Sequence, residues 1–417
     1  MNFSHLANKL RGKITRFSGI LSQDLDKTAK RFVREAVYGI MASQSVMLTE
    51  IGRRLESHVS LKKIEERLSR QLIKYRIWGC IHQRILSLAG NRVKDKTLLI
   101  LDLSDVKKKY AEKMEYLAKV HDGSEDGEIV DGYWTNQVIA TEVGSNEIIP
   151  LHMSLYSQKS PDFISENEEI LAAMDQVGEA VQNRGIWVID RGADRDAIFE
   201  PLLKKNRNFI IRMVGTRDLI YRGEIVRSLW LAYSCKLPYQ KSIMKIVDGE
   251  EVMFNLSFGH VKVQLPDMDT PLNMVVVRGL STRPMMLLTT LEIRTGQKDV
   301  WFIVQAYLRR WGVEETIRFI KQTYDLENIR VLRYTRLQNM MALLLAVFYF
   351  AAVILDQNQK LTIMTGYILK SAKRVFGIPD FKYYALGDGL SNIFSRFPGQ
   401  LKKQEEIPHP QLNFGFG

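Results

Sequence analysis

Two aspartates follow short apolar runs that are typical of buried strands. Asp102 comes directly after Thr97–Leu101, and Asp190 comes directly after Ile186–Ile189. A strand that ends in a carboxylate places it at the carboxyl edge of an α/β sheet, where such sheets bind their ligands. If the two strands are adjacent and parallel, the two carboxylates lie side by side and attract a divalent cation. Taken singly, without a third carboxylate, each aspartate is better explained as a helix cap or a turn residue.

A third carboxylate lies in residues 306–323, for which we predict one continuous helix. Four residues occur there at offsets 0, 3, 7 and 14, namely Tyr307, Arg310, Glu314 and Lys321. At about 100° per residue they fall within about 60° of one another, on one helix face. Arg318, four residues after Glu314, is close to the same face. The alternative is a solvated row of ion pairs between residues four apart.

The spacing Y-x2-R-x3-E-x6-K resembles the signature of a large group of bacterial insertion-sequence transposases. Two further segments are similar to that group's aspartate blocks: LILDLSD, in which Asp102 matches and Asp105 does not, and IDRGADR, in which Asp190 matches and Asp194 does not. The resemblance runs from about Lys96 to Leu355. It implies a DDE transposase with a ribonuclease-H-like catalytic core and a β-rich insertion between the second aspartate and the glutamate.

The resemblance also implies a mechanism. Asp102, Asp190 and Glu314 would be the catalytic residues and would hold two Mg²⁺ ions, which Mn²⁺ could replace. One ion would activate water or a 3′-hydroxyl for in-line attack, and the other would stabilise the leaving oxygen. The phosphates near the cut would be bound by the remaining polar residues of the helix, Tyr307, Arg310, Arg318 and Lys321. The expected activity is cleavage of double-stranded DNA at the element's terminal inverted repeats and strand transfer to target DNA.

One block departs from the pattern of some members. These place a tryptophan just before the strand that leads back from the insertion, where it stacks on a displaced base during hairpin formation. The comparable block here, Arg283–Thr290, carries Met285 and Met286 instead. The absence of this tryptophan puts a hairpin intermediate in doubt for this chain.

Charge is concentrated at the N-terminus. The whole chain carries a net charge of +12, and residues 1–90 hold 17 Lys and Arg against 7 Asp and Glu, a difference of 17 − 7 = +10. An excess of this kind favours a polyanionic partner. We expect helices over Asp24–Met41, Met47–Leu55 and Ser60–Ile73, the last capped by Ser60. The last two predict a helix-turn-helix, with a plain helical hairpin or a basic solubilising surface as the alternatives.

The expected fold class is multidomain α/β, a ribonuclease-H-like mixed sheet with flanking helices. We divide the chain into an all-helical DNA-binding domain at 1–90, a catalytic core at 96–213 and 300–355, and a β-rich insertion at 214–299. A C-terminal region at 356–417 is a candidate for dimerisation, since a synapse of two DNA ends implies at least a homodimer. Its end, Gln404–Gly417, is expected to be poorly ordered.

Cysteine content and hydropathy limit other classes of function. Only Cys80 and Cys235 occur, which excludes a framework of several disulfides and a zinc cluster. This low cysteine content suits a reducing compartment. We expect the protein to lie in the bacterial cytoplasm, associated with the nucleoid. Leu337–Leu355 has no charged residue, and we interpret it as a buried helix rather than a membrane anchor. Two further alternatives are a nuclease without strand transfer and an inactive, transposase-derived DNA-binding protein. None of the three carboxylates is missing, which argues against the inactive form.

Overall fold

The computed structural model describes residues 3–74, 77–121, 129–247, 250–370 and 381–401. The chain divides into two compact units, each built from separated stretches of sequence. Unit 1 comprises Met1–Ile85, Val106–Tyr133 and Arg318–Gly417, and unit 2 comprises Leu86–Asp105 and Trp134–Ile317. The predicted tail Gln404–Gly417 lies outside the described residues.

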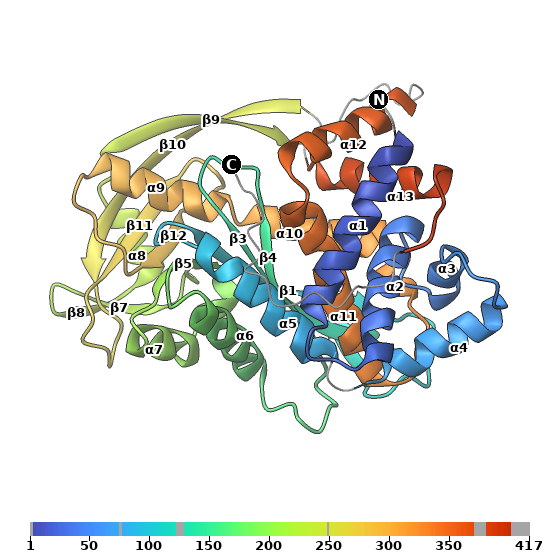
Figure 1. Cartoon of the computed structure of the whole chain (residues 1–417). Helices are drawn as coiled ribbons and strands as arrows, with labels where there is room; N and C mark the ends of the chain where they lie inside the picture. The colour runs from blue at the N-terminus through green and yellow to red at the C-terminus, as the bar shows by residue number, and fades with distance from the viewer. Residues whose placement is uncertain (1–2, 75–76, 122–128, 248–249, 371–380, 402–417) are drawn as a thin grey trace. The chain divides into compact units, whose positions relative to one another are not determined.

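Unit 2 is organised around a large mixed sheet (Figure 1). Its central strands are β1 (Leu98–Lys107), β3 (Ile129–Thr141), β4 (Ile149–Tyr156), β5 (Ile186–Ile189) and β6 (Asn208–Arg212). They lie in the order β4-β3-β1-β5-β6, with β4 antiparallel to β3, and with β1, β5 and β6 parallel to one another. This is the ribonuclease-H-like sheet that the sequence predicts. A short strand, β2 (Ala118–His121), pairs with the first half of β3 in unit 1.

The β-rich segment after β6 extends the same sheet. The long strands β9 (Tyr239–Val247), β10 (Glu250–Val263), β11 (Leu272–Arg278) and β12 (Met285–Thr289) continue it in antiparallel pairs, with β12 next to β6. A separate hairpin is formed by β7 (Asp218–Tyr221) and β8 (Glu224–Arg227), and helix α8 (Ser228–Ser234) follows it. The predicted insertion and the predicted core therefore share one sheet.

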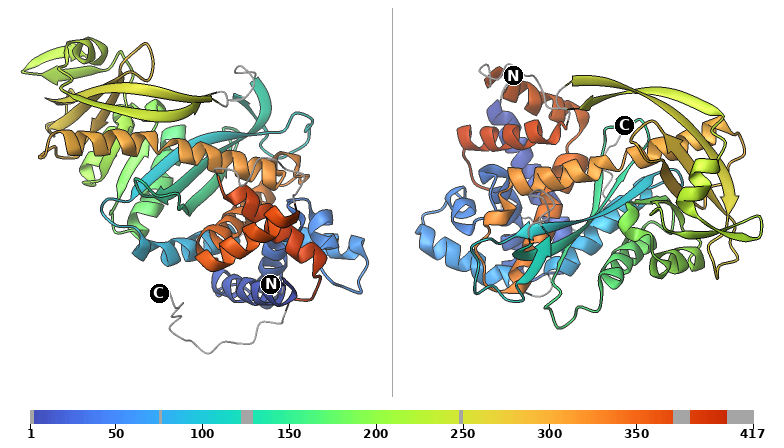
Figure 2. Two further views of the ribbon diagram at one scale, coloured as in Figure 1. Left: turned by 90° about the horizontal axis from the view of Figure 1, so that it is seen from above. Right: turned by 180° about the vertical axis from the view of Figure 1, so that it is seen from behind.

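Helices cover both faces of this sheet. Helix α9 (Gln297–Leu308) runs across one face, against β5, β6, β10 and β11, while α6 (Glu166–Ala180) and α7 (Asp196–Lys204) lie on the other (Figures 1 and 2). The Ser165 side chain caps α6 by accepting a hydrogen bond from the Glu168 amide, and the sequence Ser165-Glu166-Asn167-Glu168 has the spacing of a capping box.

Unit 1 is helical apart from β2 and the strand segments that enter it from unit 2. Its N-terminal helices are α1 (Phe3–Leu21), α2 (Lys27–Ser43), α3 (Leu48–Arg53) and α4 (Leu61–Leu72), and α5 (Ile77–Ala89) leads on into unit 2. Its C-terminal elements are η3 (Leu326–Asn328), α11 (Tyr334–Tyr349), the π-helical turn η4 (Phe350–Ile354), α12 (Gln357–Lys370) and α13 (Tyr383–Arg396). The N-terminal helices thus share a unit with residues 318–417, a division that differs from the domain boundaries expected from sequence.

Two details of the N-terminal helices differ from expectation. Helix α2 begins at Lys27, not Asp24, because the Asp26 side chain accepts hydrogen bonds from the amides of Thr28 and Ala29 and so fixes its start. Ser60 does precede α4, but its side chain makes no capping hydrogen bond.

The apolar helix near the C-terminus is buried, as predicted. Among the described residues, the helical stretch Tyr334–Ile354 is the one long and apolar enough to cross a membrane. However, 94% of its most apolar 18-residue window is covered by the rest of the protein. Packing of α11 against α2 and α4 accounts for part of that cover.

Candidate active site

The two predicted aspartates lie next to each other on parallel strands. The pairing of β1 with β5 ends at Leu101 opposite Ile189. Asp102 directly follows the first of these residues, and Asp190 directly follows the second. Sequence analysis places Asp102 at a strand end, and here the structure differs. Strand β1 runs on to Lys107 beside the long β3, where the Thr135 hydroxyl donates to the Ser104 carbonyl.

The predicted helix 306–323 is two helices. Helix α9 ends at Leu308 and α10 (Trp311–Thr323) begins three residues later. The joint is tightened by hydrogen bonds between residues three apart, from the Arg310 amide to the Tyr307 carbonyl and from the Val313 amide to the Arg310 carbonyl. Tyr307 therefore lies at the end of α9, Arg310 in the joint, and Glu314 in the first turn of α10.

Two carboxylates contact the Arg310 guanidinium, and Tyr307 binds the third. Arg310 Nη1 lies 3.2 Å from Asp102 Oδ2 and Arg310 Nη2 lies 2.5 Å from Glu314 Oε1. The Tyr307 hydroxyl donates a hydrogen bond of 3.1 Å to Asp190 Oδ1. The structure thus brings together five residues of the predicted site: Asp102, Asp190, Tyr307, Arg310 and Glu314.

Burial dominates the electrostatics of the site. It raises the pKa of Asp102 to about 7, a shift that Arg310 opposes and that Glu314 and Asp190 reinforce. Although burial disfavours the charged form of Arg310, its carboxylate neighbours Asp102 and Asp190 keep its pKa above the usual value. Burial and the charge of Asp190 raise the pKa of Tyr307 to about 12, so its hydroxyl remains a donor. An anionic cluster held together by one buried cation is the result.

The last two predicted residues belong to unit 1. Lys321 forms an ion pair of 3.5 Å with Glu327, and the side chain of Arg318 is exposed. Arg212, which was not predicted as a site residue, ends β6 and forms a hydrogen bond with the Tyr307 side chain. A basic residue directly after the apolar run of the third parallel strand is the signal that could have identified it.

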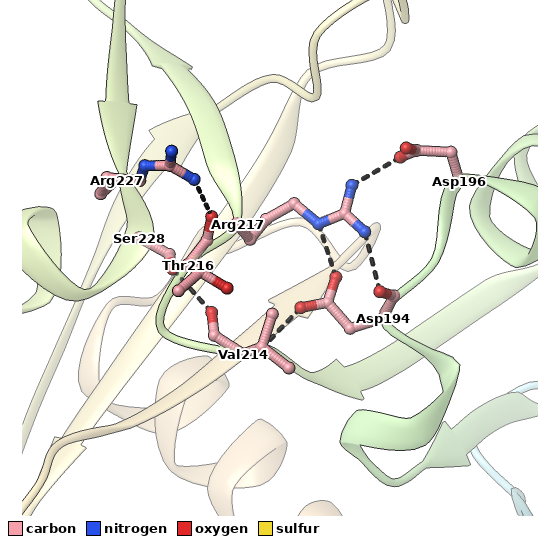
Figure 3. A network of polar contacts seen from close by, with 7 residues as sticks. All are labelled: Asp194, Asp196, Val214, Thr216, Arg217, Arg227 and Ser228. Atoms are coloured by element: carbon pink, nitrogen blue, oxygen red, sulfur yellow. Dashed lines mark hydrogen bonds and ion pairs between the residues drawn. The ribbon is translucent and has the colours of Figure 1, made fainter.

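The neighbouring acidic residue in the second aspartate block has a different environment. The Asp194 side chain is fully buried and accepts hydrogen bonds from the Val214 amide (2.6 Å) and from Arg217 Nε (2.7 Å), as Figure 3 shows. Arg217 also contacts Asp196 at 2.6 Å. These contacts fasten the loop after β5 to the residues after β6. Asp194 is therefore saturated by structural partners.

Asp105, in the first aspartate block, also differs from its neighbour. It lies three positions after Asp102 on the same strand, so its side chain points to the opposite face of the sheet. Asp105 is buried. Geometry thus separates Asp102 and Asp190 from the other acidic residues of their blocks.

The donor set suits a hard divalent cation. The side chains are oxygen donors only, the kind that Mg²⁺ and Mn²⁺ prefer. Across the described ranges, however, no group of three or more His, Cys, Asp or Glu side chains is arranged to hold a metal ion. The Arg310 guanidinium contacts both Asp102 and Glu314. The side chains are of the type that binds a divalent metal ion, but two of them already contact the Arg310 guanidinium.

The two methionines in Arg283–Thr290, the block that lacks the tryptophan of some family members, lie in the sheet. Met285 and Met286 begin β12, and both side chains are buried. Neither can stack on a displaced base without leaving the sheet.

Fold and site together define a class of protein: a ribonuclease-H-like sheet with an acidic residue directly after the paired segment of each of two adjacent parallel strands. Residues 94–350, well over half of the chain, match the family described as "Transposase DDE domain". The chain belongs to the DDE transposase family.

Other comparisons add little. A comparison with curated proteins gives no match. Among solved structures, the chain is similar to a cryo-EM structure of the piggyBac transposase synaptic complex with hairpin DNA. The TM-score is 0.42 and the identity 12%, over 94% of this chain and 85% of that one. A likeness of this degree carries no weight for function.

Proposed function

We propose that this transposase binds the terminal inverted repeats of its own element, cleaves double-stranded DNA there and transfers the 3′-hydroxyl ends to target DNA. The observation that carries the proposal is the grouping of three carboxylates, with Asp102 and Glu314 both in contact with the buried Arg310 and Asp190 close enough to interact electrostatically with Asp102 and Arg310. Acidic residues gathered in this way serve phosphoryl transfer, in which the protein mainly positions groups and neutralises charge.

The roles of the residues follow from their contacts. Asp102, Asp190 and Glu314 would hold two divalent ions, Mg²⁺ or Mn²⁺, which supply an activated oxygen nucleophile and stabilise the leaving oxygen. Tyr307 orients Asp190 through its hydroxyl. Arg310 and Lys321 would bind DNA phosphates, the first through its planar fork and the second as a point charge, and Arg318 adds exposed positive charge on the same helix.

Basic helices of unit 1 would recognise the DNA ends. On α4 the side chains of Lys62, Lys63 and Arg70 are exposed, whereas Arg67 contacts Glu35. Exposed basic side chains on one short helix suit contact with a phosphate backbone. The active form would be a homodimer that holds two DNA ends, in the bacterial cytoplasm.

The test is cleavage of the element's own ends by the purified protein in Mg²⁺, with the cuts mapped to the nucleotide. We expect Asp102→Asn, Asp190→Asn and Glu314→Gln each to lower the cleavage rate by more than about 100-fold, since even outer-shell partners of metal ligands cost 10–100-fold. DNA affinity should stay near that of the wild type. Glu315→Gln, at the next position on α10, is the matched control.

Two results would overturn the proposal. Cleavage that survives all three substitutions, or that proceeds in chelator, would remove the carboxylates from the chemistry. Cut ends that never join target DNA would make the protein a nuclease without strand transfer.

A further inference from the structure

Arg310 holds an unusual place for a residue that is expected to bind DNA phosphate. Only 6% of the residue is exposed, and its two terminal nitrogens contact carboxylate oxygens on two different elements, Asp102 on β1 and Glu314 on α10. A phosphate would have to compete with both carboxylates for the same guanidinium. As placed here, Arg310 serves the protein's own carboxylates.

A metal ion would need the same oxygens. Asp102 Oδ2 and Glu314 Oε1 already contact the guanidinium at 3.2 Å and 2.5 Å. A divalent ion coordinated by these two side chains would bring a second positive charge within a few ångströms of the buried Arg310 guanidinium, and the two like charges would repel each other. The guanidinium in this position and an ion bound by both carboxylates therefore exclude each other.

The contacts provide a route by which Arg310 can leave. Its partner Glu314 has a side chain that is 44% exposed, so this ion pair lies at the surface of the site and can open into solvent. Arg310 also lies in the joint between α9 and α10, outside both helices. The long side chain can therefore turn away without the unwinding of either helix.

We propose that Arg310 is the resident counter-cation of the metal-free site, and that it competes with the metal for Asp102 and Glu314. When the metal displaces it, its guanidinium becomes available to a DNA phosphate. This inference rests on the proposed function, because it assumes that the carboxylates bind metal. Metal and DNA then favour each other's binding, since each stabilises the arrangement in which Arg310 has left the carboxylates.

The experiment is Mn²⁺ binding by the full-length protein without DNA, followed by the electron paramagnetic resonance of free Mn²⁺. We expect Arg310→Gln to bind Mn²⁺ at least about fivefold more tightly than the wild type, the lower end of usual coupling between sites. Arg310→Lys should fall between the two, because a single ammonium cannot bridge both carboxylates as a fork does. Thermal melting of each variant verifies that it is folded.

Arg191→Gln is the matched control. It removes a positive charge one residue after Asp190, from a side chain that is exposed. Its Mn²⁺ affinity should stay close to that of the wild type. Equal tightening by Arg191→Gln and Arg310→Gln would overturn the proposal, because the effect would then come from general charge and not from competition.

The remaining outcomes separate this inference from the proposed function. If wild type and Arg310→Gln bind Mn²⁺ equally, and Glu314→Gln binds it more weakly, the competition fails while the metal site stands. If no variant binds Mn²⁺, the carboxylate site itself fails. A second measurement adds a short DNA duplex, which should tighten Mn²⁺ binding by the wild type and tighten it less in Arg310→Gln. An equal effect of the duplex on both proteins would contradict the release of Arg310.

Discussion

At the residue scale, two aspartates four positions apart have opposite surroundings. Asp190 belongs to a cluster of like charges and is hydrogen-bonded by Tyr307, whereas Asp194 is enclosed by the Val214 amide and Arg217. Asp190 is repelled by the neighbouring carboxylates, so its removal takes away an unfavourable charge interaction. Asp194 is part of a buried ion pair, and its removal leaves polar partners unsatisfied.

Stability measurements should therefore distinguish these two aspartates. We expect Asp194→Ala to lower the free energy of unfolding by about 3 kcal/mol, the low end for a broken buried pair, because Arg217 keeps its contact with Asp196. Asp190→Ala should change stability by less than about 1 kcal/mol. Urea unfolding of both variants measures the difference. An Asp190→Ala protein as destabilised as Asp194→Ala would mean that Asp190 is structural.

At the element scale, the sheet sets the spacing of Asp102 and Asp190 through the register of β1 and β5. That register begins where the Ile186 amide donates to the Thr97 carbonyl, directly after Gly185. Gly185 has φ +92°, and a Cβ there would lie 3.0 Å from both the Thr97 oxygen and the Leu99 side chain. A side chain at this turn would push β5 away from β1.

Gly185→Ala should consequently lower both stability and cleavage. Gly144, in the turn before β4, gives the matched control, because it has a similar φ of +81° but open space around its Cβ. Positive φ alone costs roughly 1–2 kcal/mol in each variant, and we expect about 1–3 kcal/mol more for Gly185→Ala from the clash. Urea unfolding and cleavage rates measure the two effects. Equal losses in both variants would contradict a role for this turn in the register.

Elements were predictable where the cause is local. The apolar runs that end at Leu101 and Ile189 indicate buried strands because all of their residues are apolar and consecutive. The Ser165 cap is local as well, because its partner is the amide of Glu168, three residues later. The continuation of β1 past Asp102 was not predictable, since it depends on pairing with β3, some thirty positions away.

The candidate site shows the same division. Asp102 and Asp190 could be placed side by side from the sequence because each follows an apolar run, a local pattern, and their role in catalysis stays a prediction. The break at residues 309–310 falls on two arginines, and Gly312 follows two residues later inside α10. Arg212 lies near Tyr307 because β6 pairs with β5. The contact of Arg310 with both Asp102 and Glu314 is likewise a product of tertiary structure.

At the scale of the whole molecule, the N-terminal helices depend on the C-terminal third of the chain. The buried Asn339 of α11 donates to the carbonyls of Leu72 and Lys74 and accepts from the Trp78 amide. Helix α2, with most of its residues buried, packs against α11 and α13. A fragment of residues 1–90 would expose these contacts to water. DNA recognition by this region is therefore best tested in the full-length protein.

The salt dependence of DNA binding tests whether α4 contacts the phosphates. Each phosphate neutralised contributes about 0.9 to the slope of log K against log salt, so replacement of Lys62, Lys63 and Arg70 by Gln should lower the slope by up to about 3. These side chains are exposed, so the fold should be unaffected. The control replaces three exposed lysines of unit 2, Lys204, Lys205 and Lys298, and should leave the slope unchanged. Affinity for an element-end duplex, measured between 50 and 200 mM salt as is usual for such slopes, provides both values. A slope that falls equally in the two triple variants would show that binding follows total charge, and would refute the assignment of α4 as the helix that contacts DNA.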